Sequence, residues 1–211
     1  SFAYRMFCIE ITMSRPPRAR KQVLDAAERI VKAHGAANLT FEELVQESGI
    51  SRGGITYHFA TKDDLLRALI ERDLEQGKAE EAKFRAAAGD GPAAELIAQI
   101  RAWSRPDADR KRFVAGMLSA VAHDPGLLDP IRCHHQAECA ARSWDEAGIR
   151  AAILKLAAAG LFWSEFFGCS EVPPEQRPRV IAAMEALAQA WTAAAEPAPA
   201  PPATPRTRTR R

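Results

Sequence analysis

Residues 40–62 constrain the fold more than any other stretch, because they encode two short helices joined by a tight corner. Thr40 and Glu43 have the spacing of a capping box, in which each side chain can bind the backbone N–H of the other residue. Gly49 can adopt the left-handed conformation that ends a helix without a side-chain penalty. Ser51 is placed to cap the helix that follows. Two short helices around a glycine-containing corner are typical of a DNA-binding helix-turn-helix.

The second of these helices carries most of the candidate contacts to DNA, because the major groove is wide enough to admit it. Its apolar positions, Ile55 and Phe59, are expected to face the core. Arg52 has the fork of donors that can bind a guanine edge through two hydrogen bonds. Gly53 and Gly54 would let the helix approach the groove closely. The predicted DNA-binding residues are Thr40, Ser51, Arg52, Gly53, Gly54, Thr56, Tyr57, His58 and Lys62.

Residues 50–66 read ISRGGITYHFATKDDLL. This run resembles the recognition helix and the following turn of the TetR/AcrR family of transcriptional repressors, in both order and spacing. Gly54 stands where many members carry threonine, and Thr56 stands where many carry tyrosine. The resemblance therefore points to Tyr57 as the phosphate-binding tyrosine of this chain.

The same resemblance implies a function. Lys62 matches the family's phosphate-binding lysine. The expected protein is a homodimeric repressor that binds a palindromic operator in double-stranded DNA and is released from it by a small-molecule effector. Two recognition helices about 34–36 Å apart would bind successive major grooves.

The remainder of the chain has a helical pattern throughout, with no alternating strand pattern after residue 14. The apolar spacing predicts an amphipathic helix over 18–34 and a long connecting helix that begins at Lys62. Further helices are expected at 92–103, 107–122, 127–147, 149–167 and 175–194, and Gly148 is expected to separate two of them. The predicted fold is all-α, with about nine helices.

These patterns divide the chain into five predicted segments. They are an N-terminal stretch at 1–14 that is either foreign to the native chain or a mobile arm, a helix-turn-helix domain at 15–62, a connecting helix at 63–89, a ligand-binding and dimerisation domain at 90–194, and a disordered Pro/Ala/Arg tail at 195–211. The net charge of +2 is nearly balanced, so the local distribution of charge matters more than the total.

In the second domain, the layout of the family suggests an effector cavity and a dimer interface. Aromatic, methionine and histidine side chains are the candidates for an apolar cavity with a few polar groups; they are Trp103, Met117, His134 and Trp163. Small and apolar residues of the last two helices are the candidates for packing against a partner; they are Leu156, Gly160, Phe167, Ile181, Met184 and Leu187.

A cysteine and histidine cluster supports an alternative function. Cys133, His135 and Cys139 fall within seven residues, and His135 and Cys139 share a helical face. The alternative is a metal or thiol redox sensor, or an enzyme, although a metal site needs three or four converging ligands and no second cluster lies nearby in the sequence. A helical bundle that binds a protein partner is a third possibility.

Neither a cofactor nor a membrane segment is expected. The four cysteines include no Cys-x-x-Cys pair, which favours a reducing compartment. No run approaches the roughly 18 apolar residues that span a bilayer. The expected location is the bacterial cytoplasm, in association with the nucleoid.

Overall fold

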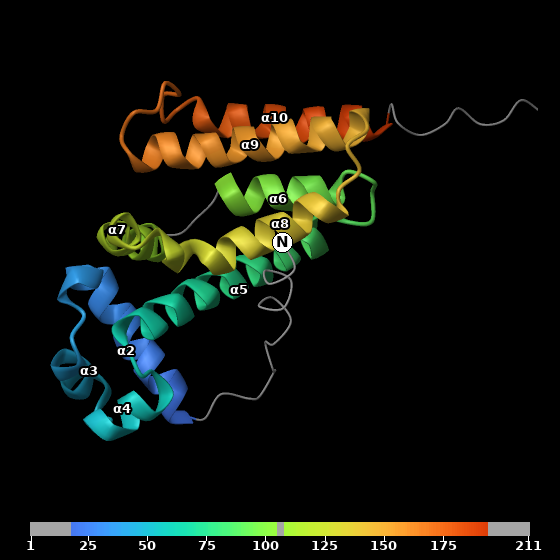
Figure 1. The fold of residues 1–211 in the computed structure, drawn as a ribbon. Coiled ribbons are helices and arrows are strands. Elements are labelled where there is room, and N and C mark those ends of the chain that lie inside the picture. Colours follow the sequence, from blue (N-terminus) through green and yellow to red (C-terminus); the bar gives the residue numbers. More distant parts are fainter. Residues whose placement is uncertain (1–17, 105–107, 194–211) are drawn as a thin grey trace, which may run out of the picture.

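The computed structural model describes residues 18–104 and 108–193, and all regular structure in these ranges is helical (Figure 1). The helices are α2 (Arg18–His34), α3 (Phe41–Ser48), α4 (Arg52–His58), α5 (Lys62–Ala88), α6 (Ala94–Ser104), α7 (Ala108–His123), α8 (Asp129–Ala141), α9 (Glu146–Phe166) and α10 (Arg177–Ala193), with 3-10 turns η1 (Ala36–Asn38) and η2 (Pro125–Leu128). The predicted all-α fold is confirmed. The predicted N-terminal stretch 1–14 and the tail 195–211 lie outside the described residues.

The helix-turn-helix end of the molecule is built on α2. The predicted apolar stripe of this helix is at most 6% exposed, and comprises Val23, Leu24, Ala27, Ile30 and Val31. Leu44 of α3, Ile55 of α4 and Phe59 pack into the same buried cluster, which we call the lower core. Burial of these side chains fixes the positions of both short helices relative to α2.

Helix α5 connects this end to the rest of the molecule (Figure 1). It begins with a capping box in which the Thr61 hydroxyl accepts from the Asp64 N–H. Leu65, Leu66 and Leu69 of its first turns are buried in the lower core. Its C-terminal half extends beyond the helix-turn-helix and packs under α6 and α8. A helix of 27 residues is about 40 Å long, so it spans the molecule.

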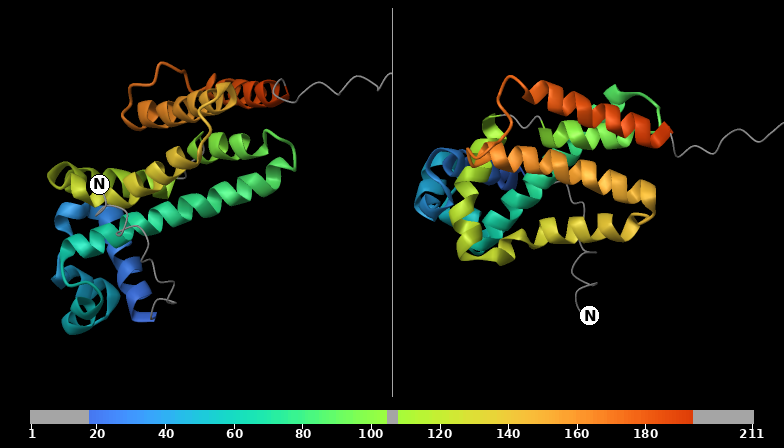
Figure 2. Two further views of the ribbon diagram at one scale, coloured as in Figure 1. Left: turned by 45° about the vertical axis from the view of Figure 1, so that its right-hand side comes forward. Right: turned by 90° about the horizontal axis from the view of Figure 1, so that it is seen from above.

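Helices α6, α9 and α10 enclose a second buried cluster, the upper core, which includes Ile100, Leu154, Leu161 and Met184. Helices α9 and α10 lie side by side across α6, on the side away from α5 (Figure 2).

Helix α7 closes the lower core from the other side, although it lies in the predicted second domain. Phe113 and Met117 are buried against α2. Between them, Gly116 passes so close to α2 that a Cβ atom there would lie 2.2 Å from the Val31 carbonyl oxygen. Only glycine permits this approach, which places α7 directly against the backbone of α2.

The predicted bounds of the helix over 127–147 are wrong. The region 125–141 forms η2 and α8, and α9 already begins at Glu146, before the break that was expected at Gly148. Gly148 lies in the first turn of α9, where its N–H donates to the Asp145 side chain at 2.9 Å. A Cβ atom at this position would lie 1.7 Å from the Ser143 carbonyl oxygen. The glycine therefore serves close packing at the start of a helix and does not separate two helices.

The substitution Gly116→Ala is expected to lower the free energy of unfolding by about 1–3 kcal/mol, because the added methyl overlaps the α2 backbone. Urea unfolding followed by circular dichroism measures this. Ser119→Ala, three residues further on the exposed side of α7, is the control and should change stability by less than about 0.5 kcal/mol. Equal stability of both variants would contradict the close packing of α7 on α2.

Candidate nucleic-acid interface

The first helix of the motif is capped as the sequence predicts. The Thr40 hydroxyl accepts from the Glu43 N–H at 3.2 Å, and the Glu43 carboxylate accepts from the Thr40 N–H at 3.3 Å. Gly49 ends the helix in the left-handed conformation, with φ of 68°. The Ser48 hydroxyl then accepts from the Ile50 N–H at 3.1 Å, which fixes the corner.

The second helix, α4, is anchored on its inner side and open on its outer side. The Ser51 hydroxyl accepts from the Gly54 N–H at 3.2 Å, so the predicted cap is confirmed. Ile55 is completely buried and Phe59 is 2% exposed, as expected for core positions. The outward face of α4 is left to solvent.

Tyr57 is the most prominent group on this open face. Its side chain is 85% exposed, although a tyrosine normally buries most of its ring. It meets the half-buried His58 edge to face, with ring centroids 5.1 Å apart. The hydroxyl is thus presented to solvent on a supported ring, which suits contact with a phosphate.

Arg52, the predicted guanine-binding residue, is engaged within the protein. Its guanidinium pairs with the Glu42 carboxylate of α3 and lies 5.6 Å from the centroid of the Phe41 ring. Glu42's own backbone N–H, and next the Arg52 guanidinium, lower the pKa of the Glu42 carboxyl. Sequence analysis missed this partner. Both side chains are about two-thirds exposed, at 64% and 67%, so the pair is weak and DNA can displace it.

The two adjacent glycines of α4 have different surroundings. Gly53 is exposed, and a Cβ atom there would meet nothing within 4 Å. Gly54 is half-buried, and its Cβ atom would lie 2.8 Å from Ile50 Cγ2. Gly54 therefore makes room for Ile50 in the corner, whereas Gly53 has open space around it; the close approach of both glycines to DNA stays a prediction.

Two further predicted contacts also have internal roles. The Thr56 hydroxyl donates to the carbonyls of Arg52 and Gly53, at 3.0 and 3.2 Å, so it must turn away from them to donate to a phosphate. The Lys62 ammonium donates to the Ala37 carbonyl at 3.1 Å, which ties α5 to η1. An ammonium carries three donors, so Lys62 can keep this bond and still reach DNA.

Two family profiles match the chain. The profile described as "Bacterial regulatory proteins, tetR family" matches residues 23–69, and "Tetracyclin repressor-like, C-terminal domain" matches residues 93–189. The first contains α3 and α4, and the second covers the helices that follow α5. The chain belongs to the TetR family of transcriptional regulators. Members of this family are DNA-binding transcription factors and not enzymes.

Curated relatives match at the helix-turn-helix end. The chain is 31% identical over 68 residues to the uncharacterized HTH-type regulator YfiR of Bacillus subtilis, covering 32% of this chain and 33% of YfiR. It is 36% identical over 83 residues to the HTH-type regulator BetI of Burkholderia thailandensis, covering 39% of this chain and 43% of BetI. The chain thus spans less than half the length of these relatives.

Solved structures share the whole fold at low sequence identity. A TetR-family regulator from Rhodococcus sp. has a TM-score of 0.60 at 16% identity, over 82% of this chain and 100% of that chain. The multidrug binding protein EbrR, solved with imidazole, has a TM-score of 0.55 at 22% identity, over 80% of this chain and 96% of EbrR.

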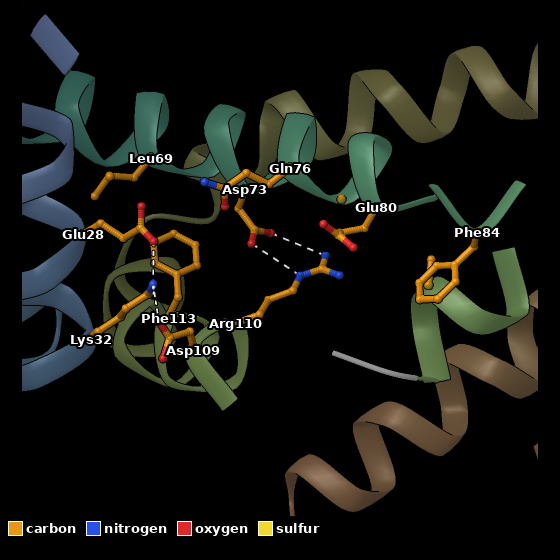
Figure 3. A pocket seen from close by; sticks show the side chains of 12 residues that line it. Glu28, Lys32, Leu69, Asp73, Gln76, Glu80, Phe84, Asp109, Arg110 and Phe113 are labelled. Atoms are coloured by element: carbon orange, nitrogen blue, oxygen red, sulfur yellow. Dashed lines mark hydrogen bonds and ion pairs between the residues drawn. The ribbon is translucent and has the colours of Figure 1, made fainter. Parts of the chain in front are cut away.

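The joint between the TetR helix-turn-helix and the second domain is lined by ion pairs, which the sequence did not reveal (Figure 3). A cavity of about 420 Å³ lies there and is lined by residues of α2, α5, α6 and α7. Lys32 bridges Glu28 at 2.6 Å and Asp109 at 3.4 Å, and Arg110 reaches Asp73 at 3.4 Å. Burial raises the pKa of the Asp73 carboxyl, and Arg110 opposes this rise. The joint is thus bridged by charged contacts of α7 with α2 and with α5.

The four predicted effector residues are not brought together around one described cavity. Met117 is buried in the lower core, whereas Trp103 packs against the upper core. Trp163 is 38% exposed on α9, and His134 lies on α8 beside Glu138. None of the four lines the cavity at the joint or a second cavity among the ends of α6, α8, α9 and α10.

The predicted dimerisation residues divide into exposed and buried groups. Leu156, Phe167 and Leu187 are 71%, 62% and 42% exposed, and Gly160 has open space where its Cβ atom would be. Ile181 and Met184 are instead 5% and 6% exposed, because they fill the upper core. The placement of these two residues at a dimer interface is corrected.

The cysteine and histidine cluster lies on α8 and forms no metal site within the described ranges, where no group of three or more His, Cys, Asp or Glu side chains is arranged to hold an ion. His134 Nε2 lies 3.7 Å from a Glu138 carboxylate oxygen, and burial lowers the pKa of His134. Cys133 and Cys139 form no disulfide with each other. Within the described ranges the metal alternative therefore has no set of three ligands, whereas both cysteines of the cluster are thiols.

Alanine substitutions should separate the two glycines of α4. Gly53→Ala is expected to raise the free energy of unfolding by up to about 1 kcal/mol, because alanine favours a helix and the site is open. Gly54→Ala should lower it by about 1–2 kcal/mol, because the methyl overlaps Ile50. Urea unfolding of the two variants in parallel measures both changes. Stabilisation by both substitutions would show that Gly54 has no packing role.

Proposed function

We propose that this TetR-family chain is a homodimeric repressor that binds a palindromic operator and is released by a small-molecule effector. The observation that carries the proposal is the open face of α4, where Tyr57 is held almost fully in solvent at the end of a rigidly anchored helix. A large polar aromatic group kept out of the core on so short a helix needs a partner outside the protein. Operator DNA in the bacterial cytoplasm is the partner that fits a recognition helix.

Recognition then proceeds by exchange of partners at Arg52. Without DNA, Glu42 holds the guanidinium beside α3. In the major groove, a guanine offers two acceptors in the geometry that an arginine fork matches. Because an exposed ion pair contributes little stability, a guanine can replace Glu42, whereas a base without these acceptors leaves the pair intact.

Dimerisation is proposed through the outer face of α9. The exposed apolar side chains of this helix and its C-cap recur at helical spacing; they are Ile149, Ile153, Leu156, Trp163 and, at the C-cap, Phe167. By length and composition α9 could cross a membrane, and only 22% of its most apolar window is buried. Its first turn is charged, and its inner side packs in the upper core. A second copy that covers the outer side explains this helix better than a bilayer does.

Helix α5 is the proposed route from the effector to DNA. At its far end, Arg85 lies 3.3 Å from Glu95 of α6, and Glu81 hydrogen-bonds to Gln99. At its near end, Lys62 and the buried leucines hold the helix-turn-helix. A ligand that moves α6 would therefore tilt α5 and change the separation of the two recognition helices. The likeness to EbrR, a multidrug binding protein, supports a small-molecule effector.

A double-mutant cycle tests the role of Arg52. Arg52→Ala is expected to cost about 1–3 kcal/mol of operator binding and to relax the sequence preference. Glu42→Gln should tighten binding in the Arg52 protein more than in the Arg52→Ala protein, since only the former gains a released guanidinium. Electrophoretic titration on an operator selected from a random library measures the four affinities. Equal gains in both backgrounds would show that Glu42 acts only through its own charge.

The variant Leu156→Asp tests the dimer. A carboxylate at this exposed apolar position should yield monomers and weaken operator binding, because two linked half-sites are lost. Sedimentation velocity gives the mass, and Ala79→Asp on the exposed surface of α5 is the control that should remain dimeric. A wild-type monomer, or a dimer that survives Leu156→Asp, would refute the α9 interface.

A further inference from the structure

The ends of α6, α8, α9 and α10 lie close together at the end of the molecule away from α3 and α4 (Figure 1). Residues of these helix ends line a second cavity. Its volume is about 780 Å³, which is within the range of about 300–1,000 Å³ found for small-molecule sites. Glu95 and Gln99, two of the α6 residues that contact α5, are part of its wall. A ligand in this cavity would therefore touch the elements through which α5 is moved.

The two carboxylates of the cavity wall are neutralised by neighbours outside it. Glu95 pairs with Arg85 at 3.3 Å. Glu138 pairs with Lys155 at 2.7 Å, and its pKa is lowered because the Lys155 ammonium outweighs the effect of burial. These carboxylates thus already have cationic partners, which leaves little attraction for a cationic ligand.

The two guanidinium groups of the wall differ from each other. Arg150 pairs with Glu146 at 3.0 Å. Arg142 has no carboxylate within ion-pair distance among the described residues, and its guanidinium lies 5.9 Å from the ring centroid of the exposed Trp144. Among the described residues, three of the four charged side chains in the cavity wall have an oppositely charged partner. The guanidinium of Arg142 is the fourth, so its positive charge is not balanced by an ion pair.

The rest of the wall is mostly apolar. Leu96, Ala141 and Ala151 contribute aliphatic surface, and Trp191 of α10 lines the open cavity, with the Arg150 guanidinium 5.7 Å from its ring centroid. Such a surface holds a flat or extended hydrocarbon. Glu81 lies behind Gln99 and does not line the cavity, and burial raises its pKa.

We propose that this cavity binds an organic anion with a single carboxylate and an apolar body. Arg142 binds the carboxylate, because a guanidinium can donate two parallel hydrogen bonds to its oxygens. The hydrocarbon lies between Leu96 and Trp191. The role of such a ligand as the effector rests on the proposed function, whereas its binding does not.

Probes that share a body and differ in charge test the proposal on the full chain. One set is decanoate, decan-1-ol and decylammonium, and the other is 2-naphthoate, 2-naphthalenemethanol and 2-naphthylmethylammonium. Each is titrated below its micelle-forming concentration by calorimetry and by tryptophan fluorescence. In at least one set the anion should bind about tenfold or more tightly than its neutral and cationic counterparts.

Variants then locate the site. Arg142→Gln should abolish the preference for the anion, and Arg142→Lys should keep part of it. Arg132→Gln, which removes an arginine of the same helix that is paired with Asp129 outside the cavity, should behave as wild type. The proposal is overturned if neither set shows an anion preference, or if Arg142→Gln retains it.

Operator binding is measured separately, so that the two failures can be told apart. A protein that binds DNA but shows no anion preference refutes this site and leaves the regulator intact. If the protein binds the anion through Arg142 and its affinity for the operator does not change, the site exists but the effector is another ligand.

Discussion

The position of the recognition helix depends on the contact between α5 and α2, and Arg72 is central to it. This guanidinium is only 19% exposed and pairs with both Asp25 and Glu28 of α2. It also donates to the Leu24 carbonyl at 2.7 Å. A buried charge is costly unless its donors are satisfied, so Arg72 favours one register of α5 against α2. The leucines of α5 in the lower core then pack with Ile55 and fix the position of α4.

Such a contact resists sliding but permits tilting. The lower core below Arg72 is closely packed, and α7 touches the α2 backbone at Gly116. Beyond Arg72, the Lys32 and Arg110 ion pairs border a cavity instead of filled core. Ion pairs with partly exposed members tolerate small shifts in distance at low cost, whereas packed side chains do not. The molecule is therefore stiff at the helix-turn-helix and compliant just above it, which suits a lever that turns about the lower core.

Sequence reasoning succeeded where the determinants are local. The capping box at Thr40, the left-handed Gly49 and the stripe of α2 depend on residues within one or two turns of each other, and the structure has them all. It failed where the interacting residue is distant in the chain, or where the room around a residue determines which side chain fits. The pairing of Arg110 with Asp73 joins residues 37 positions apart. No pattern in the sequence distinguishes the two glycines of α4. At Gly54 the Ile50 side chain leaves no room for a Cβ atom, whereas at Gly53 a Cβ atom would meet nothing within 4 Å.

The same distinction explains why the predicted effector residues were dispersed. Large aromatic and methionine side chains are the obvious candidates for a cavity, but they are also the side chains that fill cores best. Met117 was used in this way, and Trp103 packs edge to face on Phe162 with centroids 6.0 Å apart. A cavity remains where helix ends diverge and the wall carries small residues such as Ala141 and Ala151. In a helical protein of this kind, the composition of the chain thus identifies the core, while the places left open are set by how the helices end.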